Sequence, residues 1–463
     1  MGGLVILQNR AAPAIGALEV HDPPPLLHLL PGERPLVLMV EGSLLFGIEP
    51  ELFTFLRSDS KAQAELLESF RSKPAATTGT PLDPPNAISL NIAQSCNLSC
   101  SYCYADEGRF GGRATMMSAE TARAAIDHLF HDRLCNDRLC NDRLFKDTRD
   151  SRVTVGFIGG EPFLNREVLY SSVEHACLRA RETGTRVGFS VTTNGTLLTH
   201  DDLDLLRRHA FAVSVSLDGS AEVNDQYRRT RHGSGGFELA LQSLQPLLRN
   251  PGKARITARA TITRHDMRVL EHIDALAGAG FAEVGVSPLR TSPLPDLALQ
   301  EQDWPILLRE MTRAGEAERQ RLNDRKELRF SNLAVALKQL HNGYCKPLPC
   351  GAAASYVSVS ARGEYFTCHR TVDNPQFILG DTAHGLSIEN RESFLRARHV
   401  DRQEPCRSCW ARYLCGGGCH AEVLSSGRSG CDYIRGWLEY CLRFYDWVLQ
   451  EHPSLFQGGE PAS

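Results

Sequence analysis

The chain has 463 residues, of which 42% are hydrophobic and 23% are charged, so it has enough apolar side chains for two or three domain cores. Its formal net charge of −4 excludes the strongly basic surface of a general nucleic-acid binder. No apolar run reaches the roughly 18 residues of a membrane-spanning helix, and residues 1–20 lack the basic and apolar regions of a signal peptide. We therefore expect a cytoplasmic protein that binds neither nucleic acid nor membrane.

Residues 1–85 are predicted to form a separate N-terminal region. The stretch "PLVLMVEGSLLFGI" at 35–48 predicts two short strands around a turn at Glu41 and Gly42, and residues 49–58 predict a helix. Residues 71–86 are rich in proline, threonine and alanine, a composition that predicts a linker.

Strands and helices alternate from about residue 87 to residue 290. Ser118 is a candidate N-cap, because apolar residues recur at helical spacing directly after it. This alternation predicts an α/β fold with a parallel sheet, open or closed into a partial barrel, whose active residues lie at the C-terminal ends of the strands. The predicted strands are 88–93, 152–158, 186–193, 211–217, 255–263 and 283–289, and the predicted helices are 118–131, 165–182, 200–209, 237–249 and 267–278.

The rest of the chain divides into a helical linker at 300–342, a cysteine-rich domain at 343–452 and a loose tail at 453–463. A tandem pentamer, "DRLCNDRLCNDRLFK" at 132–146, fits neither the helical nor the strand period. It predicts a duplicated insertion that extends a helix or a loop, in which Cys135 and Cys140 are ordinary thiols.

Fifteen cysteines, an odd number, favour metal or iron–sulfur binding over disulfides in a reducing cytoplasm. Cys96, Cys100 and Cys103 follow the first predicted strand with the spacing C-x3-C-x2-C. Three thiolates can hold a [4Fe–4S] cluster by three irons and leave the fourth iron open to a substrate or cofactor. The alternative is a zinc site completed by a distant histidine, since residues 91–110 contain no histidine.

With Tyr102 before its last cysteine, this motif resembles the signature of the radical SAM enzymes. The resemblance implies that S-adenosylmethionine (SAM) binds the open iron and that one electron cleaves it to a 5′-deoxyadenosyl radical, which takes a hydrogen atom from the substrate. It also implies a partial (β/α)6 TIM-like barrel at residues 86–299 and an external electron donor such as flavodoxin or ferredoxin.

Further motifs end the next three strands: "GGEP" at 159–162, "SVTTNG" at 190–195 and "SLDG" at 216–219. Taken singly, each is also typical of a turn or a strand-end cap. In the family, such glycines let the backbone approach SAM and the acid accepts a hydrogen bond from its ammonium group. The resemblance assigns SAM contacts to Tyr102, Gly159, Gly160, Glu161, Ser190, Thr192, Asn194, Ser216 and Asp218.

The C-terminal cysteines resemble those of the SPASM domain, which typically holds two auxiliary [4Fe–4S] clusters; "CRSCWARYLCGGGC" alone also fits a zinc ribbon. Cys441 is a rival to Cys431 as the last ligand, and we prefer Cys431 because it precedes a predicted helix. Cys177 and Cys441 lie in amphipathic stretches and are predicted to be buried thiols. The resemblance assigns Cys345, Cys350, Cys368 and Cys419 to the first auxiliary cluster and Cys406, Cys409, Cys415 and Cys431 to the second, which makes three clusters in all.

The whole layout most resembles the maturation proteins of quinohemoprotein amine dehydrogenase. This implies thioether cross-links between cysteine and the Asp or Glu methylene carbons of a small cysteine-containing polypeptide, which the N-terminal region would grip by strand addition. An auxiliary cluster would accept the leftover electron. The thiol needs a base, for which Asp401 and Asp373 are candidates.

Two alternatives remain open. Sulfatase-maturating enzymes, which form formylglycine, are expected to carry a catalytic aspartate where this chain has His369, and a histidine can also act as a base near neutral pH. A non-enzymatic zinc or iron–sulfur protein is the other alternative.

Overall fold

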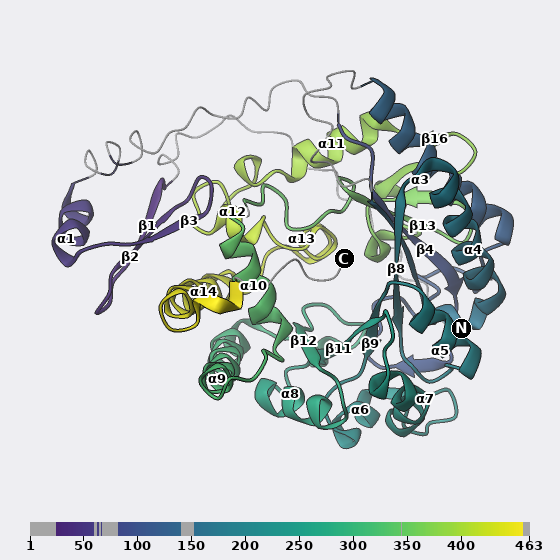
Figure 1. Ribbon diagram of the computed structural model, residues 1–463, viewed down its shortest axis with the longest axis horizontal. Helices are drawn as coiled ribbons and strands as arrows, with labels where there is room; N and C mark the ends of the chain where they lie inside the picture. The colour runs from purple at the N-terminus through teal and green to yellow at the C-terminus, as the bar shows by residue number, and fades with distance from the viewer. Residues whose placement is uncertain are drawn as a thin grey trace, which may run out of the picture.

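The computed structural model describes residues 25–59, 63, 66, 82–139, 152–343 and 345–456, with the backbone alone for residues 132–139. Within these ranges the largest element is an eleven-stranded sheet, curved into an open crescent with helices on its outer face (Figure 1). Six parallel strands are neighbours in chain order, which confirms the predicted parallel sheet that closes only part of a barrel. They are β4 (Ala87–Gln94), β7 (Arg152–Gly159), β8 (Arg186–Thr193), β9 (Phe211–Ser216), β11 (Arg255–Ile262) and β12 (Glu283–Pro288).

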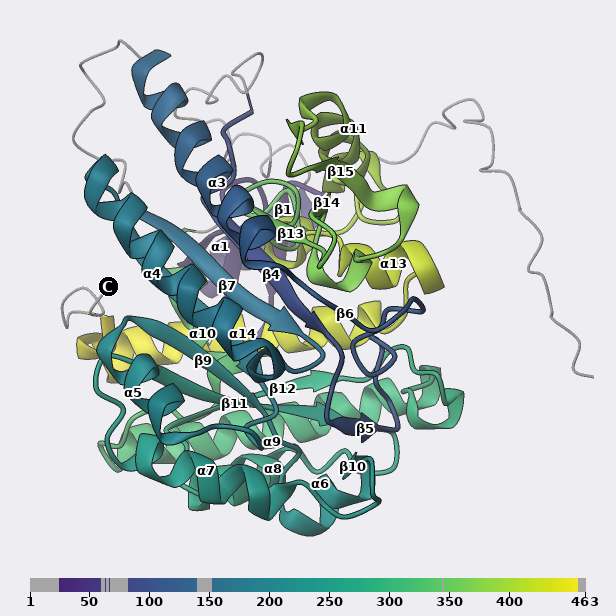
Figure 2. The same cartoon turned by 90° about the vertical axis from the view of Figure 1, so that its right-hand side faces the viewer.

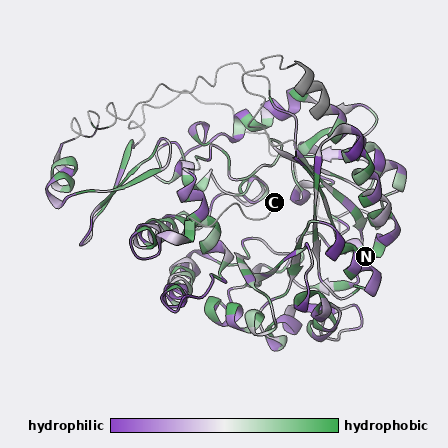
Figure 3. Ribbon diagram, in the orientation of Figure 1, coloured by the Kyte–Doolittle hydropathy of each residue, from purple (hydrophilic) through white to green (hydrophobic). Residues whose placement is uncertain are grey.

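The helices of the outer layer follow the strands as expected. Ser118 caps the first of them by accepting a hydrogen bond from the Thr121 backbone N–H at 3.0 Å, and Thr199 and Asp202 form a capping box at another. Hydrophobic and hydrophilic segments alternate along their ribbons (Figure 3), as amphipathic helices require. The expected helices are α3 (Ala119–Leu139), α4 (Arg166–Thr183), α5 (His200–Arg208), α7 (Phe237–Arg249) and α8 (Val269–Gly278). The short helix α6 (Ala221–Tyr227) was not predicted from the sequence.

Three very short strands were not expected from the sequence: β5 (Leu98–Cys100), β6 (Thr115–Met116) and β10 (Arg228–Thr230). β5 pairs antiparallel with β10, and the two lie side by side at the lower right of Figure 2. Two or three residues are too few to show a strand period, so only the tertiary fold reveals them. This pairing attaches the cysteine loop to a segment more than a hundred residues away in sequence.

The C-terminal region continues the same sheet. β13 (Tyr356–Val359) pairs parallel with β4, and β14 (Glu364–Phe366), β15 (Ile378–Asp381) and β16 (Gly385–Leu386) follow antiparallel. Several C-terminal helices lie on the open side of the crescent (Figure 1), so this region faces the ends of the barrel strands. The helices are α9 (Trp304–Asn323), α10 (Ser331–His341), α11 (Ile388–Arg398), α12 (Arg412–Cys415), α13 (His420–Ser426) and α14 (Cys431–Glu451).

Short 3-10 helices connect these elements. The first four residues of the predicted tail form one of them, and Phe456 stacks on His341 at 4.2 Å, so this part is packed rather than loose. They are η2 (Pro162–Asn165), η3 (Pro295–Leu297), η4 (Glu301–Asp303), η5 (His369–Thr371), η6 (Pro375–Phe377), η7 (Val400–Arg402) and η8 (Pro453–Phe456).

The N-terminal region contains an antiparallel sheet of β1 (Leu27–Leu30), β2 (Leu36–Met39) and β3 (Leu44–Gly47), followed by α1 (Pro50–Ser58). It packs on the C-terminal region: His28 stacks on Trp410 at 3.8 Å and its Nε2 lies 3.1 Å from the Glu439 carboxylate. The structure describes the backbone of the tandem pentamer only as far as Leu139, while Cys140 and most of the predicted linker lie outside the described residues. No helix of the described part combines the length and the apolarity needed to cross a bilayer.

Candidate active site

A cavity of about 640 Å³ lies at the C-terminal ends of the parallel strands, where the fold predicts active residues. Its lining includes the three loop cysteines, the ends of several parallel strands and residues of the cysteine-rich region. Among the lining residues are Cys96, Cys100, Cys103, Asn194, Arg370 and Glu422.

The "GGEP" turn holds the start of the cysteine loop. The backbone N–H of Gly160 donates to Ala93 O at 2.8 Å, and that of Glu161 donates to Ser95 O at 2.9 Å. A Cβ on Gly159 would lie 2.3 Å from Ala93 O, and one on Gly160 would lie 2.2 Å from Ser95 O. Both glycines line the cavity. A side chain at either position is excluded by the neighbouring backbone of the chain itself, whether or not a ligand is bound.

Glu161 is fully buried and does not line the cavity. Its carboxylate accepts hydrogen bonds from the Thr193 hydroxyl and the Asn194 backbone N–H, both at 2.8 Å, and from the Phe163 backbone N–H at 3.2 Å. Burial raises the pKa of Glu161 to about 7, against the effect of these hydrogen bonds. The structure therefore gives Glu161 the role of joining two strand ends, instead of the expected direct contact with SAM.

The residues at the end of β8 meet the cysteine loop directly. The Asn194 side-chain amide lies 3.7 Å from Cys96 Sγ and donates to Asn97 Oδ1 at 3.0 Å. Thr192, Asn194 and Ser216 line the cavity as expected. Ser190 does not, because its hydroxyl faces Gly156 inside the barrel.

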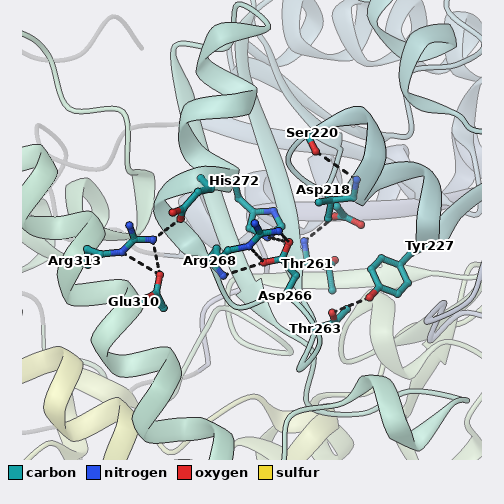
Figure 4. Close-up of polar contacts among 12 residues, drawn as sticks. Asp218, Ser220, Tyr227, Thr261, Thr263, Asp266, Arg268, His272, Glu310 and Arg313 are labelled. Carbon is teal, nitrogen blue, oxygen red and sulfur yellow. Dashed lines mark hydrogen bonds and ion pairs between the residues drawn. The ribbon is translucent and has the colours of Figure 1, made fainter.

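Asp218, like Glu161, is a predicted SAM contact that is fully buried and does not line the cavity. Its carboxylate accepts hydrogen bonds from the Tyr102 hydroxyl, from Arg228 Nε at 2.9 Å and from the Thr261 backbone N–H at 2.8 Å. Figure 4 shows Asp218 beside Thr261, with Tyr227 nearby. Asp218 thus fixes the side chains of Tyr102 and Arg228 by hydrogen bonds. Tyr102 and Arg228 line the cavity, and Asp218 does not.

Burial shifts the titration of two of the loop thiols. It raises the pKa of Cys96 to about 12, against a hydrogen bond from the Leu98 backbone, and that of Cys100 to about 11, against the charge of Arg228. Cluster binding would therefore release protons from Cys96 and Cys100. Three thiols on one loop around an open cavity fit the ligand set of a site-differentiated [4Fe–4S] cluster.

A second, smaller cavity of about 220 Å³ adjoins the first. The four cysteines assigned to the second auxiliary cluster line it, and burial raises the pKa of Cys406 to about 11, with smaller contributions from the other three. Cys441 is fully buried in the apolar core and lies apart from them. The structure thus brings together Cys406, Cys409, Cys415 and Cys431.

The set assigned to the first auxiliary cluster is only partly assembled. Burial raises the pKa of both Cys350 and Cys368, and Cys419 lies close enough to raise both further. Cys345 is exposed and accepts a hydrogen bond from the backbone of Gly42 in the N-terminal sheet, away from the other three. In the described ranges no three His, Cys, Asp or Glu side chains are grouped for one metal ion, and a four-iron cube spaces its thiolates more widely than one ion does.

The acids chosen from the sequence lie outside both cavities. Asp401 is exposed and accepts a hydrogen bond from the Tyr413 hydroxyl at 2.8 Å, while Asp373 binds Gln94 at 2.7 Å and Arg362 at 2.6 Å. Asp401 therefore lines neither of the two cavities that the loop cysteines and the second cysteine set line.

Glu422 is the functional candidate that sequence reasoning missed. It lines both the large cavity and the cavity of the second cysteine set. Its carboxylate accepts a hydrogen bond from Arg370 at 2.6 Å and lies 3.7 Å from Arg290 Nε. The sequence feature that could have identified Glu422 is its position in "CGGGCHAE", one helical turn after Cys419.

His369 also lines the large cavity, beside Cys368. Burial, followed by the charge of Arg370, lowers the pKa of His369 to about 4, and its Nδ1 lies 2.9 Å from the Tyr356 hydroxyl. It is a neutral imidazole at physiological pH.

Comparison with known sequences gives three relatives that cover most of the chain. An uncharacterised protein of Archaeoglobus fulgidus is 24% identical over 82% of this chain and 82% of its own. A serine-type anaerobic sulfatase-maturating enzyme of Bacteroides thetaiotaomicron is 22% identical, over 79% of this chain and 91% of its own. The radical SAM cyclopropyl synthase TigE of Paramaledivibacter caminithermalis is 20% identical, over 75% of this chain and 72% of its own.

A family model and solved structures agree with this picture. A model described as a 4Fe-4S single cluster domain matches residues 88–235. Native anSMEcpe with bound AdoMet superposes with a TM-score of 0.64 at 16% identity, over 80% of this chain and 100% of that chain. SuiB of Streptococcus suis bound to precursor peptide SuiA superposes with a TM-score of 0.51 at 12% identity, over 86% and 94%. Together with the cysteine loop at the head of the parallel strands, these likenesses show that the chain has the radical SAM fold.

Proposed function

We propose that this protein is a radical SAM enzyme that modifies a polypeptide. The observation that supports this best is a single cavity that is lined both by the three-cysteine loop and by residues of the cysteine-rich region. A cluster on Cys96, Cys100 and Cys103, with SAM beside Thr192 and Asn194, would supply the abstraction of a hydrogen atom from an unreactive carbon. Solved structures of the same fold are described with bound substrates: anSMEcpe with a Cys peptide and SuiB with its precursor peptide.

The finer proposal is a thioether bond between a substrate cysteine and the methylene carbon of a substrate Asp or Glu, in a small cysteine-containing polypeptide. One C–H and one S–H bond break and one C–S bond forms. The substrate therefore loses a hydrogen atom from carbon, a proton from sulfur and one further electron. Iron–sulfur clusters at the C-terminal cysteines would supply the electron acceptor, and five of these cysteines line the smaller cavity that adjoins the large one.

Glu422 is the proposed acceptor of the thiol proton. Arg370 and Arg290 pair with its carboxylate and fix its position, and a carboxylate can act as a proton acceptor. Its position between the two cavities places it next to both the reacting centre and the second cysteine set. This assignment replaces Asp401.

Formylglycine formation, the reaction of sulfatase-maturating enzymes, is the second candidate. It is supported by relatives of that name and by the neutral His369 at the position where an aspartate is expected. The two reactions give different products, since the second converts a thiol to an aldehyde without forming a cross-link.

We further propose that the three-stranded N-terminal sheet grips the substrate by strand addition. An external donor such as flavodoxin or ferredoxin would reduce the loop cluster, in the cytoplasm.

The test is anaerobic reconstitution of the full chain, followed by incubation with SAM, a reductant and a candidate polypeptide. Mass spectrometry should find two hydrogens lost per cross-link. A polypeptide unchanged in mass despite SAM cleavage contradicts that substrate, and an aldehyde selects the second candidate. Metal analysis should find about twelve irons per chain, as three cubanes require; zinc without iron would contradict the proposal.

A further inference from the structure

Arg228 is a buried arginine attached to the cysteine loop by backbone pairing. It lies in β10 directly opposite Cys100 in β5, and the backbone N–H of Ser101 donates to Tyr227 O at 3.0 Å. Its guanidinium carbon lies 5.3 Å from the centre of the Tyr102 ring. The side chain is 11% exposed, so solvent screens its charge weakly.

Asp218 fixes the position of this charge. Arg228 Nε donates to its carboxylate at 2.9 Å, and the same carboxylate accepts from the Tyr102 hydroxyl and from the Thr261 backbone N–H. Its side chain is completely buried. Two charges taken out of water cost free energy, so an apolar pair of similar size would fill this place as well or better. The ion pair therefore calls for a role other than stability.

We propose that Arg228, positioned by Asp218, raises the reduction potential of the iron–sulfur group on the cysteine loop. This rests on the proposed function only in that Cys96, Cys100 and Cys103 hold that group. One electron enters from an external reductant, and Arg228 neither gains nor loses a proton. A fixed positive charge beside a ligand sulfur stabilises the more negative, reduced form.

The sign depends on which member of the ion pair the sulfur senses more strongly. Arg228 and Cys100 stand directly opposite one another in an antiparallel pair, and both line the large cavity. Asp218 is fully buried and does not line this cavity. The positive member of the ion pair is therefore the one that faces the cysteine loop.

The experiment is a potentiometric titration of the reconstituted full-length protein, which follows the reduced-cluster EPR signal that SAM perturbs. Arg228→Gln should move the midpoint to a more negative value, and Arg228→Lys, which keeps the charge, should move it less. Arg231→Gln is the matched control, because Arg231 is exposed and pairs loosely with Glu107 at 3.6 Å. Its midpoint should equal that of the wild type.

Asp218→Asn gives an independent test, because it removes the opposing charge and leaves the arginine. Its midpoint should shift to a more positive value. A wild-type midpoint in Arg228→Gln with full iron content overturns the inference, and so does a negative shift or no shift in Asp218→Asn. If Arg228→Gln takes up no iron, the sign in Asp218→Asn decides. A wild-type protein without any SAM-perturbed signal would instead overturn the proposed function.

Discussion

Arg370 Nη1 lies 2.6 Å from the carboxylate of Glu422, and this pair stands where the cavity of the three-cysteine loop meets the cavity of the second cysteine set. Arg370 also stacks over Tyr104 at 4.8 Å, which limits its movement. The pairing with Arg370 therefore fixes the position of the Glu422 carboxylate at the junction of the two cavities.

Replacement of the Glu422 carboxylate should impair modification of the polypeptide without impairing the cleavage of SAM. Glu422→Gln keeps the shape but cannot accept a proton, so we expect polypeptide modification to fall by about 10² or more. SAM cleavage and iron content should stay near wild type. Mass spectrometry of the polypeptide and chromatography of 5′-deoxyadenosine measure the two.

Two acids serve as controls for that variant. Asp401→Asn and Glu316→Gln change exposed carboxylates outside both cavities, and both should leave modification unchanged. Full modification by Glu422→Gln, or its loss in Asp401→Asn, would contradict the assignment of the base.

Gly160 should be required for the loop cluster. A Cβ there would meet Ser95 O at 2.2 Å and the Cβ of Cys96 at 2.9 Å, so Gly160→Ala must displace the cysteine loop. Iron should fall by about four atoms per chain, one cubane. Gly278→Ala is the matched control, since a Cβ there meets no atom within 4 Å; equal iron content in both variants would refute this role.

Cys431 and Cys441 lie in different surroundings, and the iron content of two variants distinguishes which of them is a cluster ligand. Cys431→Ala should lose iron, because Cys431 lines the cavity of the second set. Cys441→Ala should keep all iron and lower the free energy of unfolding by about 1 kcal/mol, as expected for a small cavity in the core. The reverse result for iron would make Cys441 the ligand.

Most strands and helices of the barrel were predictable, because the alternation of apolar strands with amphipathic helices is a local pattern. Each of the six parallel strands ends within one residue of its predicted bounds. β5 and β10 were not predictable, since their pairing depends on a contact between Cys100 and Arg228 that the local sequence does not encode.

The site was predictable as a set of positions but not as a set of roles. Glu161 and Asp218 were expected on SAM, yet the structure uses both carboxylates to hold strand ends and the cysteine loop. A motif shows which residue types stand together, whereas the direction of each side chain depends on packing. The role of Glu422 was not predictable for the same reason, since its partners Arg370 and Arg290 come from distant segments of the chain.

Stability should depend on pH through Asp202, whose side chain is buried. Burial would raise its pKa, but hydrogen bonds from Arg166 at 2.8 Å, Tyr170 at 2.6 Å and Thr199 lower it below the usual range. A depressed folded-state pKa stabilises the fold above the unfolded value of about 3.9, and this contribution is lost as pH falls through the folded pKa.

Asp202→Asn should therefore lower the free energy of unfolding by about 2 kcal/mol at pH 7, and by less at pH 3. Asp204→Asn, which removes an exposed partner of Arg207, should change it by under about 0.5 kcal/mol. Denaturant unfolding at the two pH values measures both, and an Asp202→Asn effect that grows toward low pH would contradict the assignment.

The central claim is that Cys96, Cys100 and Cys103 hold a cluster that cleaves SAM. The most direct measurement is the formation of 5′-deoxyadenosine by the anaerobically reconstituted full chain with SAM and a reductant, compared with a Cys103→Ala variant. The wild type should form 5′-deoxyadenosine and the variant should form none. Equal amounts from both proteins, or none from a wild type that has its full complement of iron, would contradict the account.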